Sequence, residues 1–479
     1  MPPASGAGLT RRAAMACSLA AAGLATGPRG AGAQTADPWL LATRIRNRIV
    51  VPAFPDRTFA ITAFGAVGDG RTLCTRAINA AVNACGDAGG GRVIVPGTGN
   101  ARTFLTGAIR LRSNVNLVVE TGATLLFSTD PRDYLPVVRT SYEGSECFNY
   151  APFIYAPSRT NVAVTGGGVL DGQASNSFWW PWSGNPSRGW SAGMPSQEPD
   201  RTNLHAQNAD GVPVGQRVYG AGHYLRPSFL QFRRCTNVLV EGVTIHDGPF
   251  WIVHPLMCQS VTIRNVTVVS RGPNNDGVDI ENCRDVLVAG CSFDTGDDCI
   301  AIKSGRPQDG VQRGSPSRYV VVANNHARSA ISAIAFGSEQ DRKIQDVFVE
   351  DLMVDNPNVA YGLYFKANRR WGSGVIERVH ARRVSLAGAR NAPLGVNLRF
   401  GGITDGSYLP VVRGLDITEM TCPRSTNVLV LNGLAEAPVS DVSVSNSSFS
   451  NVSGPAVVQN HVTGLRLSNV RVNGAVLNS

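Results

Sequence analysis

The sequence predicts an all-β fold built from stacked coils, with a capping helix near the N-terminus. The chain has 479 residues, of which 52 are glycine and 16% are charged, and this composition suits many short strands joined by tight turns. Short segments rich in β-branched residues recur along it. The copies that begin at Asn237, Ser260 and Asp285 start about 24 residues apart, within the range of repeat proteins. Such a period, in strands too short to enclose a core alone, indicates that successive copies stack.

Each copy consists of a polar residue, a short strand and a turn with glycine, asparagine or aspartate, as in residues 237–242 and 285–290. The theme returns at residues 346–351, and the last two copies, at 441–446 and 464–469, again start one such period apart. A β-propeller is the alternative repeat, but each of its blades needs about 40 to 45 residues. Stacked coils fit the shorter period, and they place residues one period apart at about 4.8 Å from each other.

One helix is expected near the start of the repeats, over residues 75–85. Its apolar residues fall on one helical face, and the glycines at 89–91 follow its end. A strand is expected directly after it, at residues 93–96. We therefore expect this helix to cap the N-terminal end of the stack.

Residues 1–33 resemble an export signal of the twin-arginine type. Arg11 and Arg12 precede an apolar run at residues 13–25, and small residues at 31–33 form a cleavage site. The apolar run is too short to span a membrane as a helix, and no later segment is long enough. We therefore expect a signal peptide at residues 1–33 and a single β-helix domain at residues 34–479. The mature protein should be a soluble monomer, periplasmic or secreted.

The charge of the chain favours an anionic partner. The formal net charge is +9, and it stays positive when Arg11, Arg12 and Arg29 are removed with the signal. The sequence contains no basic run interleaved with aromatic residues and no nucleic-acid-binding motif. A polyanionic sugar is therefore a better candidate than nucleic acid.

The ten cysteines give no metal or redox motif. Cys17 lies in the signal, and no CxxC pair occurs among the rest, so a zinc or dithiol site is not expected. Most of the others lie in or beside strand-like segments, where a cysteine acts as a small buried hydrophobe. One or two disulfides stay open, and the sequence does not pair them.

The densest polar cluster spans residues 273–279 and returns one coil later at residues 294–299. Asp276 and Asp297 are separated by close to one period, so Asp276 should lie beside Asp297 or Asp298 on adjacent coils. Carboxylates this close cannot all ionise freely, and at least one pKa should rise. Cleavage of a glycosidic bond needs such an acid for the leaving oxygen, and a second carboxylate that activates water or attacks carbon.

Two other roles compete with catalysis at these aspartates. Aspartates at repeated turns cap coils through hydrogen bonds to the backbone, which suits Asp294, while Asp279 stays undecided. A carboxylate cluster also suits a calcium ion. Burial of three carboxylates without compensation would be costly, so catalysis or metal binding is the better interpretation of the cluster.

At these residues the sequence resembles glycoside hydrolase family 28, the polygalacturonases and their relatives. The resemblance covers nearly the whole mature chain. Its motifs, in order, are residues 64–70 (FGAVGDG), 166–173 (GGGVLDGQ), 249–251 (PFW), 254–255 (HP), 274–277 (NNDG), 296–298 (GDD) and 302–305 (IKSG). It implies a right-handed, single-stranded parallel β-helix that hydrolyses glycosidic bonds with inversion and without a metal or other cofactor. Carried over by residue, Asp297 would donate the proton, while Asp276 and Asp298 would activate the attacking water.

The resemblance implies a pectic polysaccharide or oligosaccharide that contains galacturonic acid as the substrate. We expect Asn274, Lys303, Lys366, Tyr364 and His254 to contact it. His254 lies about one coil before the aspartates, although a lone histidine beside a proline is more often structural. Tyr364 could stack on a sugar face, although an aromatic residue in a strand more often belongs to the core.

Two departures from the family pattern bear on the substrate. Ile331 stands where members that cleave polygalacturonate carry a histidine, and residues 364–366 (YFK) replace an Arg-Ile-Lys motif. An arginine fork binds a sugar carboxylate better than a lysine point charge does. A rhamnose, a xylosylated galacturonate or another branched pectic unit is therefore as plausible beside the cut as plain polygalacturonate. Endo and exo action both stay open.

Tryptophans gather at positions 179, 180, 182 and 190. Aromatic faces pack on sugar rings, so these residues could form a wall of the binding site. Alternatively, the loop folds on its own aromatic residues. The sequence favours neither interpretation.

Two other functions stay open at this point. One is a pectate lyase on the same fold, which eliminates rather than hydrolyses and depends on calcium and a basic catalyst. The other is a carbohydrate-binding β-helix without catalysis, which the two lost basic motifs support.

Overall fold

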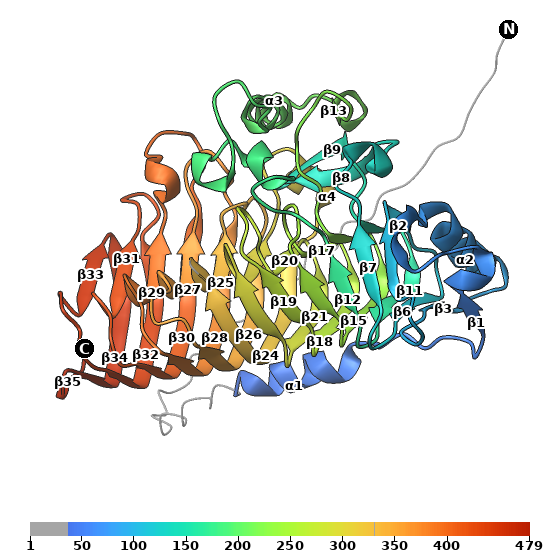
Figure 1. Cartoon of the computed structure of the whole chain (residues 1–479). Coiled ribbons are helices and arrows are strands. Elements are labelled where there is room, and N and C mark those ends of the chain that lie inside the picture. The colour runs from blue at the N-terminus through green and yellow to red at the C-terminus, as the bar shows by residue number, and fades with distance from the viewer. Residues whose placement is uncertain (1–36, 330) are drawn as a thin grey trace, which may run out of the picture. The chain divides into compact units, whose positions relative to one another are not determined.

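The computed structural model describes residues 37–479 except residue 330, so the expected signal at residues 1–33 lies outside the described part of the chain. Two long sheets run along the stack of coils (Figure 1). Apart from the pairing of β34 (Val462–Val472) with β35 (Ala475–Leu477), the strands of both sheets pair in parallel. The parallel β-helix predicted from the repeat is therefore confirmed.

The larger sheet forms two sides of each coil. Besides β34 and β35 it contains β1 (Thr58–Ala60), β2 (Asp69–Leu73), β3 (Gly91–Val95), β4 (Thr103–Thr106), β6 (Val115–Val119), β7 (Thr124–Phe127), β11 (Thr160–Thr165), β12 (Val169–Asp171), β15 (Thr236–Glu241), β16 (Thr244–His246), β18 (Gln259–Arg264), β19 (Thr267–Ser270), β21 (Arg284–Ala289), β22 (Ser292–Thr295), β24 (Ser317–Ser329), β26 (Ile344–Val354), β28 (Val375–Leu386), β30 (Val411–Cys422) and β32 (Val439–Phe449). The smaller parallel sheet forms the remaining side. It contains β5 (Ile109–Arg110), β10 (Ile154–Pro157), β14 (Leu230–Arg233), β17 (Val253–Leu256), β20 (Val278–Glu281), β23 (Ile300–Lys303), β25 (Ser332–Gly337), β27 (Tyr361–Lys366), β29 (Ala392–Asn397), β31 (Leu429–Asn432) and β33 (Val457–Asn460).

Each predicted repeat forms one strand of the larger sheet, and the strands stack in register. Val238 pairs with Val261, Val261 with Val286, Val286 with Val320 and Val320 with Val347. All five side chains are fully buried. Branched side chains stacked in this way fill the interior of the coil without gaps, and their burial is the main source of stability.

The polar residue at the start of each repeat has a left-handed backbone. Asn237, Ser260, Asp285, Asp346 and Asp441 all have φ between 55° and 59°. The strand pairing skips these positions, so each coil bends there. Asparagine and aspartate tolerate this conformation better than most residues with a side chain. The polar start of the repeat therefore meets a backbone requirement of the bend.

Helix α2 (Thr75–Asp87) confirms the predicted capping helix, because Ile78, Ala81 and Cys85 on its inner face are fully buried. The sequence did not predict helix α1 (Trp39–Arg48). Its buried residues Ala42 and Ile45 pack against the outer face of β24 and β26. Only these two residues of the helix are buried. The helix therefore lacks the continuous apolar face by which it could have been identified in the sequence.

Segments inserted between coils rise above the smaller sheet (Figure 1). A hairpin of β8 (Val138–Tyr142) and β9 (Ser145–Asn149) pairs with β13 (Val218–Tyr219), and α3 (Glu198–Ala209) packs against β9. A short helix α4 (Asp309–Arg313) follows β23. Short 3₁₀ turns complete the connections at η1 (Ile61–Phe64), η2 (Pro131–Tyr134), η3 (Trp180–Ser183), η4 (Pro186–Arg188), η5 (Val214–Gln216) and η6 (Phe400–Gly402).

The nine cysteines from Cys74 to Cys422 are all buried and unpaired, as expected for small core residues. Cys235, Cys258 and Cys283 occupy matching positions on three successive coils. The backbone N–H of Cys235 donates to Cys258 Sγ at 3.3 Å, and that of Cys258 to Cys283 Sγ at 3.2 Å. None of the described helices is long and apolar enough to cross a membrane.

Substitution of the buried Val286 by alanine should weaken the stack. Val286 contacts the strand on each side, so its truncation leaves a cavity that two coils share, and we expect about 1–3 kcal/mol of lost stability. Thermal and denaturant unfolding midpoints of the purified variant measure this loss. The exposed Ser292→Ala on the same coil is the control. Equal midpoints for the two variants would contradict this account of the core.

Candidate active site

Three aspartates meet at the start of neighbouring strands of the smaller sheet. Asp276 precedes β20 and Asp297 and Asp298 precede β23, and Val278 of β20 pairs with Ile300 of β23. Asp276 therefore lies on the coil beside the other two, as their spacing in the sequence predicted. One carboxylate oxygen from each aspartate lies within 4.8 Å of the others. Asp276 and Asp298 are buried, and Asp297 is half-buried.

The aspartates lie in a cleft of about 390 Å³. Its lining residues come from the smaller sheet, its following loops and the inserted segments: Glu143, Arg201, Trp251, Asn274, Asp276, Asp297, Asp298, Lys303, Ile331, Ser338, Glu339, Lys366, Trp371 and Phe400. Charged side chains of both signs therefore surround a hollow large enough for a sugar unit.

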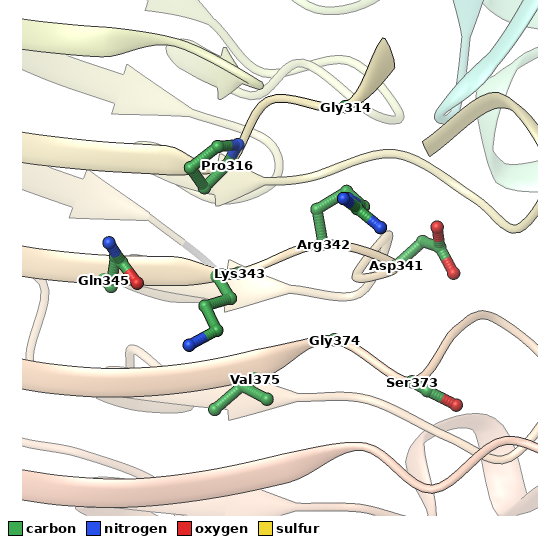
Figure 2. A pocket seen from close by; sticks show the side chains of 9 residues that line it. All are labelled: Gly314, Pro316, Asp341, Arg342, Lys343, Gln345, Ser373, Gly374 and Val375. Atoms are coloured by element: carbon green, nitrogen blue, oxygen red, sulfur yellow. The ribbon is translucent and has the colours of Figure 1, made fainter. Parts of the chain in front are cut away.

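A second hollow, of about 480 Å³, opens where β24, β26 and β28 begin (Figure 2). Its charged lining residues are Asp341, Arg342 and Lys343, and Lys343 forms an ion pair with Glu377 at 3.1 Å. Asp341 is the one carboxylate that lines this hollow, whereas glycosidic hydrolysis generally uses a pair of carboxyl groups. The cleft with the aspartates is therefore the candidate active site.

Two buried lysines balance the carboxylates of the cleft. Lys366 Nζ lies 2.6 Å from Asp298 Oδ2. Burial opposes the charge of Lys366, but Asp298 and Asp297 outweigh it and raise the pKa of Lys366 to about 12. Nearby carboxylates therefore keep the ammonium groups of both Lys366 and Lys303 charged.

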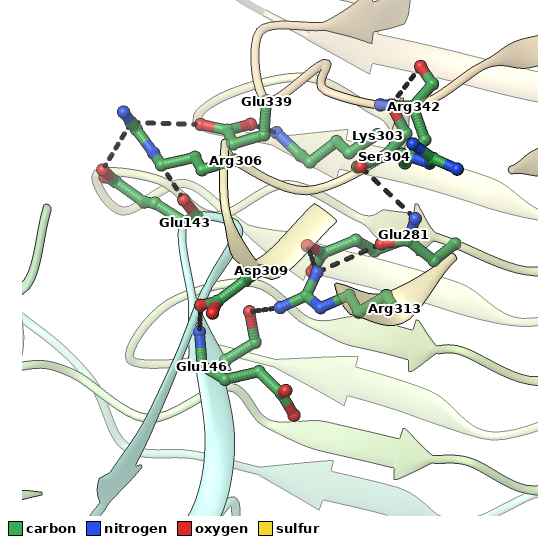
Figure 3. Close-up of polar contacts among 12 residues, drawn as sticks. Glu143, Glu146, Glu281, Lys303, Ser304, Arg306, Asp309, Arg313, Glu339 and Arg342 are labelled. Atoms are coloured by element: carbon green, nitrogen blue, oxygen red, sulfur yellow. Dashed lines mark hydrogen bonds and ion pairs between the residues drawn. The ribbon is translucent and has the colours of Figure 1, made fainter. Parts of the chain in front are cut away.

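Lys303 is shared among three carboxylates. Its Nζ lies 3.1 Å from Glu339 Oε2, 3.6 Å from Asp279 Oδ1 and 3.8 Å from Asp276 Oδ2 (Figure 3 shows the contact with Glu339). Burial alone would lower the pKa of Lys303, but Glu339, Asp276 and Asp279 raise it well above the usual value. One ammonium cannot neutralise three carboxylates, so protons must supply part of the balance.

The carboxyl groups of Asp297 and Asp276 hold protons more tightly than usual. Burial, followed by the charge of Asp298, raises the pKa of Asp297. Burial, followed by the charges of Asp279 and Asp297, raises the pKa of Asp276 well above its ordinary value. A carboxyl that stays protonated near neutral pH can act as a general acid.

Asp279 belongs to the cluster, although the sequence left its role undecided. Its side chain is fully buried, and neither of its carboxylate oxygens has a hydrogen-bond partner among the described residues. Burial raises the pKa of Asp279 well above its usual value, with Lys303 opposing this and Asp298 adding to it. A buried carboxylate without hydrogen bonds is costly, so the protonated form is favoured.

Asn274 lines the cleft beside Asp276, and a residue that the sequence did not reveal holds its side chain in place. The fully buried Arg226 donates from Nη2 to Asn274 Oδ1 at 2.7 Å, and from Nη1 to the backbone oxygen of Pro273 at 2.7 Å. The backbone of Asn274 is left-handed, with φ of 55°. Arg226 lies outside every quoted motif, so no sequence signal pointed to it.

His254 does not face the cleft, and we correct its expected contact with substrate. Its side chain has no exposed surface, and its Nε2 lies 2.9 Å from Glu281 Oε2, while Nδ1 lies 3.0 Å from Gln231 Nε2. Burial lowers the pKa of His254, with Glu281 opposing. Arg313 of α4 bonds to Glu281 as well (Figure 3) and donates to Ser141 of β8 at 3.0 Å, so α4 and the hairpin cover this part of the sheet.

Tyr364 is also a core residue rather than part of the cleft lining. It is 7% exposed, and its ring stacks on Tyr361 with 4.0 Å between the ring centroids. Lys303, Lys366 and Asn274, by contrast, all line the cleft. We therefore correct the expected contact of Tyr364 with substrate: Tyr364 packs in the core, which was the alternative interpretation.

The aromatic residues of the cleft differ from those that the sequence suggested. Trp179 is 3% exposed and packs edge-on against Tyr134 and Trp182, so that loop folds on its own aromatic residues. Trp371 and Phe400 line the cleft instead, from loops that follow β27 and β29. Their positions just after strand ends were the only signal, and it was too weak to identify them.

Among the described residues, the three aspartates are the one group whose positions would allow them to bind a metal ion together. A calcium ion needs six to eight oxygen ligands, and here the ammonium groups of Lys303 and Lys366 already approach Asp276 and Asp298. A calcium ion between these aspartates would meet the positive charge of both ammonium groups. The donor set therefore fits proton transfer better than calcium.

A parallel β-helix with a carboxyl acid, further carboxylates and buried lysines in an open cleft is the arrangement expected of a carbohydrate-cleaving hydrolase. The model of glycosyl hydrolases family 28 matches residues 220–401. A hyperthermoactive exopolygalacturonase from Thermotoga maritima, known from its crystal structure, is 40% identical, with 92% of this chain and 97% of that chain covered and a TM-score of 0.86.

Two further relatives agree with this family. A probable polygalacturonase from Vitis vinifera is 28% identical over 404 residues, which cover 81% of this chain and 73% of that protein. An exo-poly-alpha-D-galacturonosidase from Dickeya chrysanthemi is 30% identical over 332 residues, or 66% of this chain and 53% of that protein. The chain therefore belongs to glycoside hydrolase family 28 and is an enzyme acting on O-glycosyl bonds. The lyase and the non-catalytic binding protein are not favoured.

The substitution Asp279→Asn should stabilise the protein at neutral pH. Because its pKa is raised in the fold, ionisation of Asp279 above the unfolded value of about 3.9 costs stability as the pH rises. The uncharged amide removes this cost, so the melting temperature should exceed that of the wild type at about pH 7, by a margin that shrinks toward about pH 4.

Melting curves at several pH values measure this effect. Asp294→Asn is the control, because Asp294 lies in β22 outside the cleft lining and pairs with the exposed Arg271. A lower melting temperature for Asp279→Asn at neutral pH would show that Asp279 is ionised in the fold.

Proposed function

We propose that this enzyme hydrolyses galacturonan linkages of pectic polysaccharide, beginning at a chain end. The observation that carries the proposal is the set of three aspartates in one cleft, with Lys366 bonded to Asp298 at 2.6 Å. Similarity to exopolygalacturonases supports the choice of galacturonan over the rhamnose-containing and xylosylated alternatives.

Asp297 is the proposed proton donor. It is half-buried in the cleft, so its carboxyl can reach a bound sugar, and burial together with Asp298 raises its pKa. In the protonated form it gives its proton to the glycosidic oxygen as the bond to the anomeric carbon breaks. The ammonium of Lys366 on Asp298 then stabilises the negative charge that remains on the aspartates.

Asp276 and Asp298 are proposed to hold the attacking water. Two hydrogen bonds of about 2.7–2.8 Å each can link carboxylate oxygens up to about 5.5 Å apart. The observed spacing, within 4.8 Å, therefore accommodates one bridging water. The water attacks the anomeric carbon on the face opposite the leaving oxygen and gives its proton to the carboxylate of Asp298, so the configuration at that carbon inverts. The carboxyl groups are closer than the roughly 6.5–9.5 Å that is usual in inverting enzymes, which makes the product anomer a sharp test.

The inserted segments support action at a chain end. Glu143 at the turn of the β8–β9 hairpin and Arg201 of α3 both line the cleft. Arg306, from the loop after β23, donates to the backbone oxygen of Glu143 at 2.7 Å and so fastens the hairpin to the coils (Figure 3). We propose that this wall ends the cleft, so that the end of a sugar chain enters it. We also propose export through the signal at residues 1–33 and action as a monomer outside the cytoplasm.

Incubation of the purified enzyme with polygalacturonate, rhamnogalacturonan and xylogalacturonan tests the proposed substrate. Polygalacturonate should release short saturated products, with reducing ends appearing well before the viscosity falls. Proton NMR of the first product should show the inverted anomer. Products that absorb in the ultraviolet and vanish with a chelator would identify a lyase, and a rapid fall in viscosity would identify internal cleavage.

The substitution Asp297→Asn should lower kcat on polygalacturonate by about 10²- to 10⁴-fold, because the amide cannot donate the proton. The melting temperature should not fall, since the amide has the same shape and removes the cost of ionising a carboxyl group whose pKa is raised. Asp294→Asn, three residues earlier in β22, is the matched control and should keep its activity. Wild-type turnover in Asp297→Asn would rule out Asp297 as the acid.

A further inference from the structure

We propose that Arg201 binds the carboxylate of the galacturonate unit that enters the closed end of the cleft. The inference depends on the proposed function, because it concerns the binding of the same anionic substrate. Arg201 comes from α3, in a segment inserted between β12 and β14, so it lies outside the repeating coils. It is a determinant of substrate choice rather than a group that takes part in the chemistry.

Exposure distinguishes Arg201 from the other cations that line the cleft. The side chains of Lys303 and Lys366 are 5% and 8% exposed, whereas that of Arg201 is 32% exposed. Carboxylates of the protein already surround both lysines. Of the lining cations in the described part of the chain, Arg201 therefore offers by far the most surface to a ligand.

The contacts of Arg201 leave part of its guanidinium for a substrate. Its Nε donates to Glu143 Oε2 at 2.7 Å, and its Nη1 lies 3.4 Å from Glu198 Oε2. A guanidinium carries five N–H groups in a planar fork that matches a carboxylate. The hydrogen bonds that the structure describes use Nε and Nη1, so Nη2 remains for an incoming carboxylate.

The surroundings hold Arg201 in place. Glu143 contacts Arg201 and also Arg306, whose Nη2 lies 3.7 Å from Glu143 Oε2 and 3.7 Å from Glu339 Oε1 (Figure 3). His205 lies 3.4 Å from Glu143, and burial, followed by the charges of Arg306 and Arg201, lowers its pKa to about 2, so it adds no charge. A cation fixed in advance loses little freedom when it binds a ligand.

Charge balance shows why an accessible cation is needed. The cleft is lined by the carboxyl groups of three aspartates, Glu143 and Glu339, against three cations. Even with Asp276 and Asp297 protonated, the loss of Arg201 would leave three carboxylates against two lysines, and this negative excess would repel a galacturonate chain. Arg201 is the side chain in a position to offset that repulsion.

Arg201→Gln should raise KM for trigalacturonate by about 10- to 100-fold, the range for loss of a charge-assisted hydrogen bond, with kcat within about threefold of wild type. Arg201→Lys should give an intermediate KM. The KM of Arg201→Gln for the fully methyl-esterified trimer, which lacks the charge, should match that of the wild type. An unchanged KM for the acidic trimer would overturn the proposal.

A second variant separates binding from a role in holding the wall. Glu198→Gln removes the exposed contact to Arg201 Nη1 but keeps the cation and its bond to Glu143, so the KM for the acidic trimer should stay near the wild-type value. An equal rise in KM for the acidic and the esterified trimer in Arg201→Gln would show that Arg201 only supports the wall. Failure of the wild type to cleave any galacturonan would instead refute the proposed function, so the two failures are distinguishable.

Discussion

Parallel stacking in register is the constraint on which this structure depends. A column such as Val238, Val261 and Val286 fills the core only when equivalent residues lie directly above each other, and the left-handed bends recur at matching positions for the same reason. The same register places Asp276 beside Asp298, because Gly277 donates its backbone N–H to the oxygen of Asp298 at 3.0 Å. The rule that stabilises the stack thus also brings the carboxylates of the cleft together.

Bringing these carboxylates together is unfavourable, and the chain offsets the cost with cations from later positions in the stack. Lys303 is the last residue of β23 and Lys366 is the last residue of β27, whereas the three aspartates precede β20 and β23. Each ammonium group therefore approaches the aspartates from the other end of the strands. Glu339 keeps Lys303 charged, and the buried carboxyl group of Asp279 adds to a cluster that has fewer cations than carboxyl groups. Burial, together with the negative charge of Asp298, raises the pKa of Asp297. The unfavourable grouping of carboxyl groups therefore also provides the site with its proton donor.

The sequence predicted the features that depend on the spacing of its repeats. The stacked coils, α2 and the meeting of Asp276 with Asp297 and Asp298 all follow from spacing. Lys303, Lys366 and Asn274, which were predicted to contact substrate, line the cleft. It failed where other segments cover the coils. His254 pairs in register beside Gln231, but Glu281 and the elements above it seal it from the cleft. Arg226, Arg201 and α1 carry no periodic signal, because tertiary contacts alone determine their positions.

The inserted segments and the coils therefore contribute different parts of the function. The coils fix the spacing of the reacting carboxyl groups, and any change there disturbs the stack of the neighbouring coils as well. The ion pair of Arg201 with Glu143 joins α3 to the β8–β9 hairpin, and these segments pack through an apolar cluster that includes Tyr142, Leu204 and Phe250 and is separate from the main core, so they can change with little effect on that core. Because the cation most exposed to the cleft comes from α3, the choice of substrate can vary independently of the hydrolysis itself.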